Sequence, residues 1–242
     1  MNLFCFPYAG GSGAVFNSWK PHLDKNITLY PVEMAGRGKR INEEPYHNIE
    51  EAVDDIFEGI SSELQQAPFM FFGHSLGALI SYELALKLRK LHFPQPLHLF
   101  FSGKGAPHID SEDEKKYHLM KDDEFRTEVL RLGGTPPEFF DHPELLELFV
   151  PLLKNDFRIA ENYFHKGDVV PFDQNITIFL GKHDNLTEEQ CNKWKEFTNK
   201  GCNIHHFEGG HFFLHDHMMQ IIEIINNTKG ITENRLQNNW PG

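Results

Sequence analysis

The sequence predicts an α/β fold, with a mainly parallel β-sheet flanked by helices. Short apolar runs bounded by Gly, Pro and Asn alternate with longer stretches of helical periodicity. Such alternation is typical of a parallel sheet covered on both faces, because a helix carries the chain back before the next parallel strand begins. The chain has 242 residues, 40% of them hydrophobic, so we expect residues 1–242 to form a single domain around one core.

Six apolar runs have the length and composition of buried strands. They occupy residues 3–7, 27–32, 69–72, 97–101, 176–180 and 203–207. Helical periodicity is clear after the second run, where apolar residues recur every three or four positions. These residues are Ile49, Val53, Ile56, Ile60 and Leu64. We predict helices at 48–64, 76–91, 188–199 and 214–226.

The segment 107–170 breaks the alternation, because it contains no convincing strand. It is rich in acidic residues and includes a Gly-Gly-Thr-Pro-Pro run at 133–137. Two groups of apolar residues predict two short helices within it. The first group is Phe125, Val129, Leu130 and Leu132, and the second is Leu145, Leu146, Phe149, Leu152 and Leu153. We interpret 107–170 as a helical insertion after the fourth strand, positioned as a lid.

Charge and cysteine content argue against several functions. The formal net charge is -12, which disfavours nucleic acid and anionic membranes as partners. Cys5, Cys191 and Cys202 are too few and too widely spaced to suggest a disulfide framework or a zinc site, so we expect a reducing, cytoplasmic setting. The pattern of a signal peptide and an apolar stretch long enough to cross a membrane are both lacking.

The segment 73–77, Gly-His-Ser-Leu-Gly, has the G-x-S-x-G pattern. It follows the apolar strand 69–72 and opens a long helix, which are the two elements that a nucleophile elbow joins. Gly73 and Gly77 allow strand and helix to approach closely, and Ser75 would lie at the helix N-terminus, where the helix dipole favours negative charge. We therefore predict a serine hydrolase of the α/β-hydrolase fold with Ser75 as the nucleophile.

A serine nucleophile needs a base, and the base needs an acid. His211 follows the last strand and Asp184 follows the strand before it, so both are expected at the carboxyl edge of the sheet. The order Ser75, Asp184, His211 is the order expected for this fold. Asp156 and Asp173 are rival acids, but neither directly follows a strand, and Asp156 fits a lid helix better.

The oxyanion of the reaction requires backbone N–H donors. One is expected from Leu76, directly after the nucleophile. The other is expected from the glycine-rich loop after the first strand, where we choose the N–H of Ala9 and keep Tyr8 as the alternative. The lack of G-x-x-x-x-G-K-[ST] at this loop excludes a P-loop.

Together, these motifs resemble the stand-alone type II thioesterases that accompany non-ribosomal peptide and polyketide synthetases. The resemblance covers almost the whole chain. It rests on the Phe-Pro-Tyr-Ala-Gly-Gly start at 6–11, Gly-Arg-Gly at 36–38, the elbow, Leu-Gly-Gly-Thr-Pro at 132–136, Asp-Phe-Arg at 156–158, 181–184, Trp194, and Gly-Gly-His-Phe-Phe at 209–213. Ala35 departs from the proline that is usual before the Gly-Arg-Gly motif.

The resemblance implies a function and a set of partners. Such enzymes hydrolyse misprimed or stalled acyl groups from the phosphopantetheine arm of carrier domains. They act as monomers, without a metal or an organic cofactor of their own, since the pantetheine belongs to the substrate. The resemblance also implies the catalytic roles of Ser75, Asp184 and His211, and the donor roles of Ala9 and Leu76. Because carrier domains are commonly acidic, the basic cluster at 37–40 is one expected docking contact, with a solvated basic loop as the alternative.

Other functions stay open on the sequence. A fatty-acyl thioesterase, a small-molecule carboxylesterase and an acyltransferase of the same fold would share the same three catalytic residues, because substrate choice depends on the pocket. A non-enzymatic binding module on this scaffold is disfavoured by the intact set of Ser75, Asp184 and His211.

Overall fold

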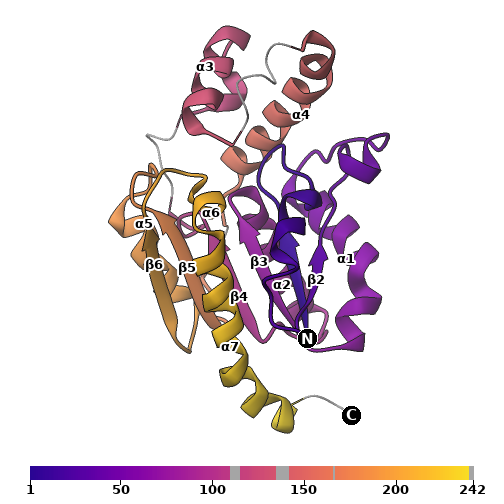
Figure 1. The fold of residues 1–242 in the computed structure, drawn as a ribbon, viewed down its shortest axis with the longest axis vertical. Coiled ribbons are helices and arrows are strands. Elements are labelled where there is room, and N and C mark those ends of the chain that lie inside the picture. The colour runs from indigo at the N-terminus through magenta and orange to yellow at the C-terminus, as the bar shows by residue number, and fades with distance from the viewer. Residues whose placement is uncertain (110–114, 135–141, 166, 240–242) are drawn as a thin grey trace.

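A computed structural model describes residues 1–109, 115–134, 142–165 and 167–239 (Figure 1). Six parallel strands form one sheet in the order β2-β1-β3-β4-β5-β6. The strands are β1 (Asn2–Phe6), β2 (Thr28–Pro31), β3 (Phe69–His74), β4 (His98–Ser102), β5 (Asn175–Gly181) and β6 (Cys202–Phe207). The predicted fold class and the six predicted strands are confirmed, with ends that shift by one or two residues.

Both faces of the sheet are buried, which explains why the strands read as nearly continuous apolar runs. Successive side chains of a strand point to opposite faces. In β1, Phe4 and Phe6 therefore belong to one core cluster and Leu3 and Cys5 to the other.

Different helices cover the two faces. The first face packs against α1 (Ile49–Gln66), α2 (Leu76–Lys90), α5 (Glu188–Asn192) and the 3₁₀ helix η5 (Lys193–Phe197). The second packs against the 3₁₀ helix η1 (Gly13–Trp19), α6 (Phe213–Asp216) and α7 (Met218–Asn239). A further 3₁₀ turn, η2 (Gly38–Arg40), lies in the loop after β2.

Two of the predicted helices are interrupted, and one element is new. The stretch predicted as one helix at 188–199 is α5 followed by η5, and the stretch at 214–226 divides into α6 and α7 at His217. The 3₁₀ helix η1 has too short a pattern to be read as a helix from periodicity. Its Phe16 and Trp19 nevertheless fill the second face of the core.

Between β4 and β5, the structure places η3 (Tyr117–Leu119), α3 (Asp122–Leu132) and α4 (Pro143–Asn162). In Figure 1, α3 and α4 lie beyond the carboxyl ends of the strands. Phe125, Val129 and Leu153 form a small apolar core of their own. Thr135, Pro136 and Pro137 of the glycine-proline run lie outside the described residues. We keep the name lid for η3, α3 and α4, and its action as a lid stays a prediction.

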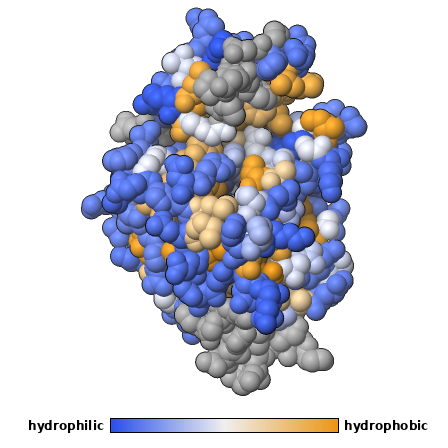
Figure 2. Space-filling view, viewed as in Figure 1, coloured by the Kyte–Doolittle hydropathy of each residue, from blue (hydrophilic) through white to orange (hydrophobic). Residues whose placement is uncertain are grey.

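The surface of the molecule is mostly hydrophilic in the view of Figure 2, with small apolar patches at the lid end and over the middle of the molecule. Leu119, Leu145 and Leu148 are exposed on η3 and α4. None of the helices in the described residues is both long and apolar enough to span a bilayer.

The start of α2 depends on the absence of a side chain at Gly77. A Cβ at this position would overlap the carbonyl oxygens of Phe6 and Pro7. We expect Gly77→Ala to lower the free energy of unfolding by at least about 2 kcal/mol, because the backbone must move to relieve the overlap. Urea denaturation followed by circular dichroism measures this change.

Gly59→Ala is the matched control, since Gly59 lies inside α1 and, apart from the backbone of its own helix, nothing lies within 4 Å of the position that its Cβ would take. This change should raise stability by about 0.5–1 kcal/mol, as glycine is a poor helix residue. A loss of stability in Gly59→Ala equal to that in Gly77→Ala would contradict the steric explanation.

Candidate active site

Ser75 occupies a sharp turn between β3 and α2. Its backbone has φ 55° and ψ −116°, a conformation that costs energy for any residue with a side chain. A Cβ at Gly73 would overlap the carbonyl oxygen of Gly77, so the turn closes only because both positions are glycine. The Ser75 N–H donates to the carbonyl of Ser102 at 2.8 Å, which ties the turn to the end of β4. This is the geometry of a nucleophile elbow.

His211 and Asp184 meet at the same edge of the sheet. The His211 Nδ1 lies 2.9 Å from the Asp184 Oδ2, and the side chains are only 15% and 7% exposed. Their loops are joined by backbone hydrogen bonds, from the Lys182 N–H to Phe207 and from the His183 N–H to Gly209. A carboxylate at Nδ1 fixes the tautomer in which Nε2 can accept a proton.

Ser75, Asp184 and His211 all line one cavity of about 530 Å³. Tyr117, Leu132 and Phe157 of the lid line the same cavity. In the described part of the chain, no hydrogen bond joins Ser75 to His211, so the shared cavity is what associates Ser75 with the His–Asp pair. Unliganded sites often have such loose contacts, which tighten when substrate binds.

The two expected oxyanion donors lie beside the elbow rather than on the cavity wall. Leu76 is the first residue of α2, where N–H groups have no partner within the helix. Ala9 lies in a turn closed by a hydrogen bond of 2.9 Å from the Gly11 N–H to the Tyr8 carbonyl. This loop is adjacent to the elbow, because Gly77 packs directly against the backbone of Phe6 and Pro7.

A contact between the lid and this loop was not expected from the sequence. Asp156, on α4, accepts hydrogen bonds from the Gly10 N–H at 2.7 Å and from both terminal nitrogens of Arg37 at 2.5 and 3.0 Å. Asp156 and Arg37 are 2% and 3% exposed. Asp156 is thus a lid residue, as expected, and is not the partner of His211. The sequence singles out both residues through the motifs Gly-Arg-Gly and Asp-Phe-Arg, but neither motif indicates that Arg37 and Asp156 pair with each other.

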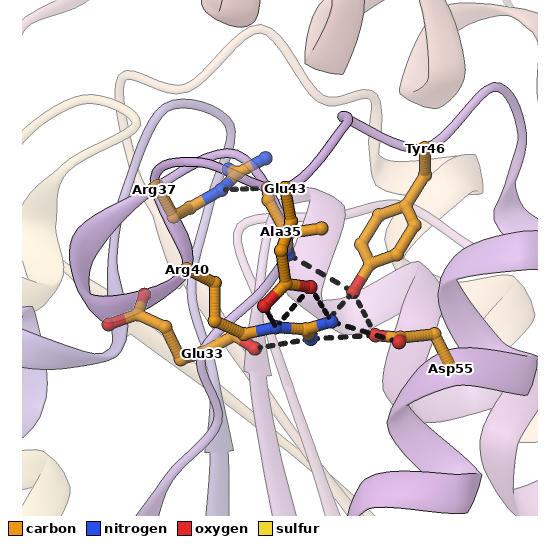
Figure 3. Close-up of polar contacts among 7 residues, drawn as sticks. All are labelled: Glu33, Ala35, Arg37, Arg40, Glu43, Tyr46 and Asp55. Atoms are coloured by element: carbon orange, nitrogen blue, oxygen red, sulfur yellow. Dashed lines mark hydrogen bonds and ion pairs between the residues drawn. The ribbon is translucent and has the colours of Figure 1, made fainter.

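The expected docking role of the basic cluster at 37–40 is wrong for Arg37, which is buried against Asp156. Arg40 is held by ion pairs to Glu43 and Asp55, and the Tyr46 hydroxyl donates to the same Asp55 carboxylate (Figure 3). These contacts fix the loop after β2. Lys39 is the one cation of the cluster that is exposed.

His74 lies under the site and is completely buried. Its Nδ1 is 2.8 Å from the Ser102 Oγ, and its ring packs against the rings of His211, Phe212 and Tyr8. Burial lowers the pKa of His74 well below its ordinary value of 6.5, and the nearby His211 lowers it further. A histidine that stays neutral suits a packing role beneath the elbow.

The parallel sheet, the strained serine between strand and helix, and the His–Asp pair at the carboxyl edge define an α/β-hydrolase. Within that class, the family model of the thioesterase domain matches residues 1–228. The chain belongs to the thioesterase family.

Individual similar proteins support the assignment to this family. The gramicidin S biosynthesis protein GrsT of Aneurinibacillus migulanus is 37% identical over 226 residues, covering 93% of this chain and 87% of GrsT. ClbQ from the colibactin NRPS/PKS pathway superposes with a TM-score of 0.89 at 34% identity, over 96% of this chain and 98% of ClbQ. The type II thioesterase BorB from the borrelidin cluster gives 0.80 at 28% identity, over 93% and 89%. The resemblance to type II thioesterases is confirmed.

The buried His74 predicts a loss of stability in acid. Because its pKa is lowered in the folded protein, the unfolded chain binds a proton that the folded chain does not, so stability is complete above pH 6.5 and falls as the pH drops below it. The expected contribution to the slope is about 1.4 kcal/mol per pH unit. Urea denaturation between pH 5 and pH 8 measures it.

His74→Gln should flatten this slope by the contribution of one proton, since glutamine does not titrate. His22→Gln, at an exposed position, is the control and should keep the slope of the unmodified protein. Equal slopes in all three proteins would show that His74 does not carry the effect.

Proposed function

We propose that this chain is an editing type II thioesterase, which hydrolyses misprimed or stalled acyl groups from the phosphopantetheine arm of carrier domains in non-ribosomal peptide or polyketide biosynthesis. The observation that carries the proposal is the cavity between sheet edge and lid, into which Ser75 and the hydrogen-bonded pair of His211 and Asp184 all open. The family membership and the relatives from such biosynthetic pathways support the substrate class.

In the first half of the proposed reaction, the Ser75 Oγ attacks the thioester carbonyl and His211 takes its proton at Nε2. Asp184 stabilises the charged imidazole through Nδ1. The carbonyl oxygen becomes an oxyanion held by the N–H groups of Leu76 and Ala9. The C–S bond breaks, His211 returns the proton to the departing pantetheine thiol, and an acyl ester of Ser75 remains.

In the second half, a water molecule gives its proton to His211 and attacks the acyl ester. The same donors hold the second oxyanion, and the proton passes from His211 to the Ser75 Oγ as the free acid leaves. Every step uses side chains and backbone groups of this chain, so we propose no cofactor of its own. Among the described residues, no cluster of three or more His, Cys, Asp and Glu has the arrangement of a metal site.

The carrier arm would enter through the cavity mouth. Lys104, Lys115 and Arg131 line the cavity together with Glu161 and Asp184, and Lys115 and Arg131 are both paired with Glu128. The three cations are the groups of this lining that suit a substrate whose arm carries a phosphate. The carrier domain is the proposed partner, and cytoplasmic synthesis the proposed setting.

The direct test loads acetyl or butyryl groups onto a phosphopantetheinylated carrier domain and follows their release by mass spectrometry. We expect rapid release by the unmodified protein and a loss of at least about 1,000-fold in Ser75→Ala, because no other group replaces the nucleophile. The matching p-nitrophenyl esters should turn over much more slowly.

Three outcomes would replace the proposed activity with another one. Ser75-dependent turnover of free esters without release from the carrier would indicate a carboxylesterase. A preference for long acyl chains on the carrier would indicate a fatty-acyl thioesterase. Transfer of the acyl group to an added alcohol or amine, detected among the products, would indicate an acyltransferase.

The role of Asp184 is tested by Asp184→Asn, which keeps the shape of the side chain but removes the charge that stabilises the imidazolium. We expect kcat to fall on the order of 1,000-fold or more. Asp173→Asn is the matched control, because Asp173 is hydrogen-bonded to Asn199 before the start of β5. An unchanged kcat in Asp184→Asn would remove Asp184 from the proposed mechanism.

A further inference from the structure

The buried carboxylate of Asp156 lies between the lid and the loop after β1. It belongs to α4 of the lid, and its Oδ2 accepts the Gly10 N–H from the loop after β1. That loop begins against the first turn of α2, which carries Ser75 at its start. Asp156 therefore contacts the turn that contains Ala9 without lining the cavity itself.

The contact fixes a particular form of the turn. Gly10 has φ 73°, and the Gly11 N–H bonds to the Tyr8 carbonyl, which together are the pattern of a type II turn with Ala9 and Gly10 at its centre. Type I and type II turns differ by a rotation of the central peptide, which carries the Gly10 N–H. An acceptor at that N–H therefore selects one orientation of the peptide that follows Ala9.

Packing joins the same turn to the lid. A Cβ added at Gly10 would lie 2.8 Å from the Leu153 Cδ1 and 3.0 Å from the Phe149 ring, so α4 rests directly on the glycine backbone. The Ala9 side chain packs against the lid core. The turn is thus joined to α4 by a backbone hydrogen bond and by apolar contacts.

Arg37 allows the carboxylate to be buried. A lone buried carboxylate would be protonated or exposed to water, because desolvation of a charge costs several kcal/mol. The guanidinium pairs with both oxygens of Asp156. It also donates from Nε to the Ala35 carbonyl at 3.2 Å (Figure 3). The bidentate pair therefore fixes the direction in which the carboxylate points.

We propose that Asp156 is a positioning residue, which holds the turn from Tyr8 to Gly11 so that the Ala9 N–H meets the oxyanion, and thereby couples the oxyanion hole to the lid. The inference rests on the proposed thioesterase mechanism, in which Ala9 is a donor. It assigns to a lid residue a role in stabilising the transition state and not in binding the acyl group.

The decisive variant is Arg37→Met/Asp156→Leu, which removes both charges together and leaves no unpaired buried ion. Two ligands separate the roles. With an alkyl trifluoromethyl ketone, the Ser75 Oγ adds to the ketone carbonyl and the serine proton passes to His211. The carbonyl oxygen becomes a tetrahedral oxyanion, and fluorine NMR detects this adduct. The matching acyl-pantetheine amide binds without forming that oxyanion.

We expect the double variant to lose affinity for the ketone and kcat by the same factor, on the order of 10-fold to 100-fold, because a misplaced donor stabilises only the transition state. Its affinity for the amide should stay within about twofold of the unmodified protein. The ratio of the two affinities does not depend on the folded fraction, so a destabilised variant remains informative. An equal loss for both ligands, or no loss for the ketone, would overturn the proposal.

Two single variants sharpen the result. Asp156→Asn keeps an oxygen that can accept the Gly10 N–H but leaves the buried Arg37 cation without its counter-charge. It is therefore compared by the ratio of ketone to amide affinity, which should change less than in the double variant; an equal change would overturn the role of this hydrogen bond. Asn155→Ala removes the neighbouring bond from α4 to the Tyr46 carbonyl, at 2.9 Å, and should leave both affinities unchanged. A selective loss in Asn155→Ala would assign the effect to lid anchoring in general.

Failure of this inference is distinguishable from failure of the proposed function. If the unmodified protein releases nothing from carrier domains but hydrolyses p-nitrophenyl esters, the editing function is wrong. The variants are then compared on those esters, where the same oxyanion forms and the same ratios are measured.

Discussion

The close approach of α2 to β1 and β3 is the constraint on which the site depends. Helix and strand backbones come together at Gly73 and Gly77, where any side chain would overlap a carbonyl oxygen. This approach forces Ser75 into its positive-φ conformation and lifts it out of the sheet at the carboxyl edge. Two buried core clusters hold the arrangement, one on each face of the sheet, so the strain at Ser75 is supported by packing on both faces.

The parallel sheet then explains why residues distant in sequence meet. All six strands end at one edge, so the loops after β1, β3, β5 and β6 converge there. The Asp184 and His211 loops follow the paired strands β5 and β6 and are joined by backbone hydrogen bonds, which bring His211 Nδ1 to 2.9 Å from Asp184 Oδ2. The carboxyl ends of the strands are where sites on open α/β sheets lie.

The lid adds an electrostatic link to this rigid frame. The ion pair of Arg37 and Asp156 is buried between the loop after β2 and α4, and its carboxylate also binds the Gly10 backbone. Buried ion pairs contribute little net stability, since desolvation offsets most of the attraction, but breaking one partner costs several kcal/mol. Such a pair specifies an arrangement more than it stabilises the fold. That property suits a connection between α4 and the loop after β1.

The sequence by itself determined the sheet, the elbow and the chain order of Ser75, Asp184 and His211, because apolar periodicity and glycine spacing are local signals. It did not reveal that 188–199 and 214–226 are each interrupted, since small changes of helix type leave the apolar pattern intact. Nor did it show that Arg37 is buried against Asp156. A basic residue in a polar loop looks solvated until its partner, 119 positions away, is brought to it. Only the tertiary structure decides such pairings, because burial and charge compensation depend on contacts between segments that no local pattern encodes.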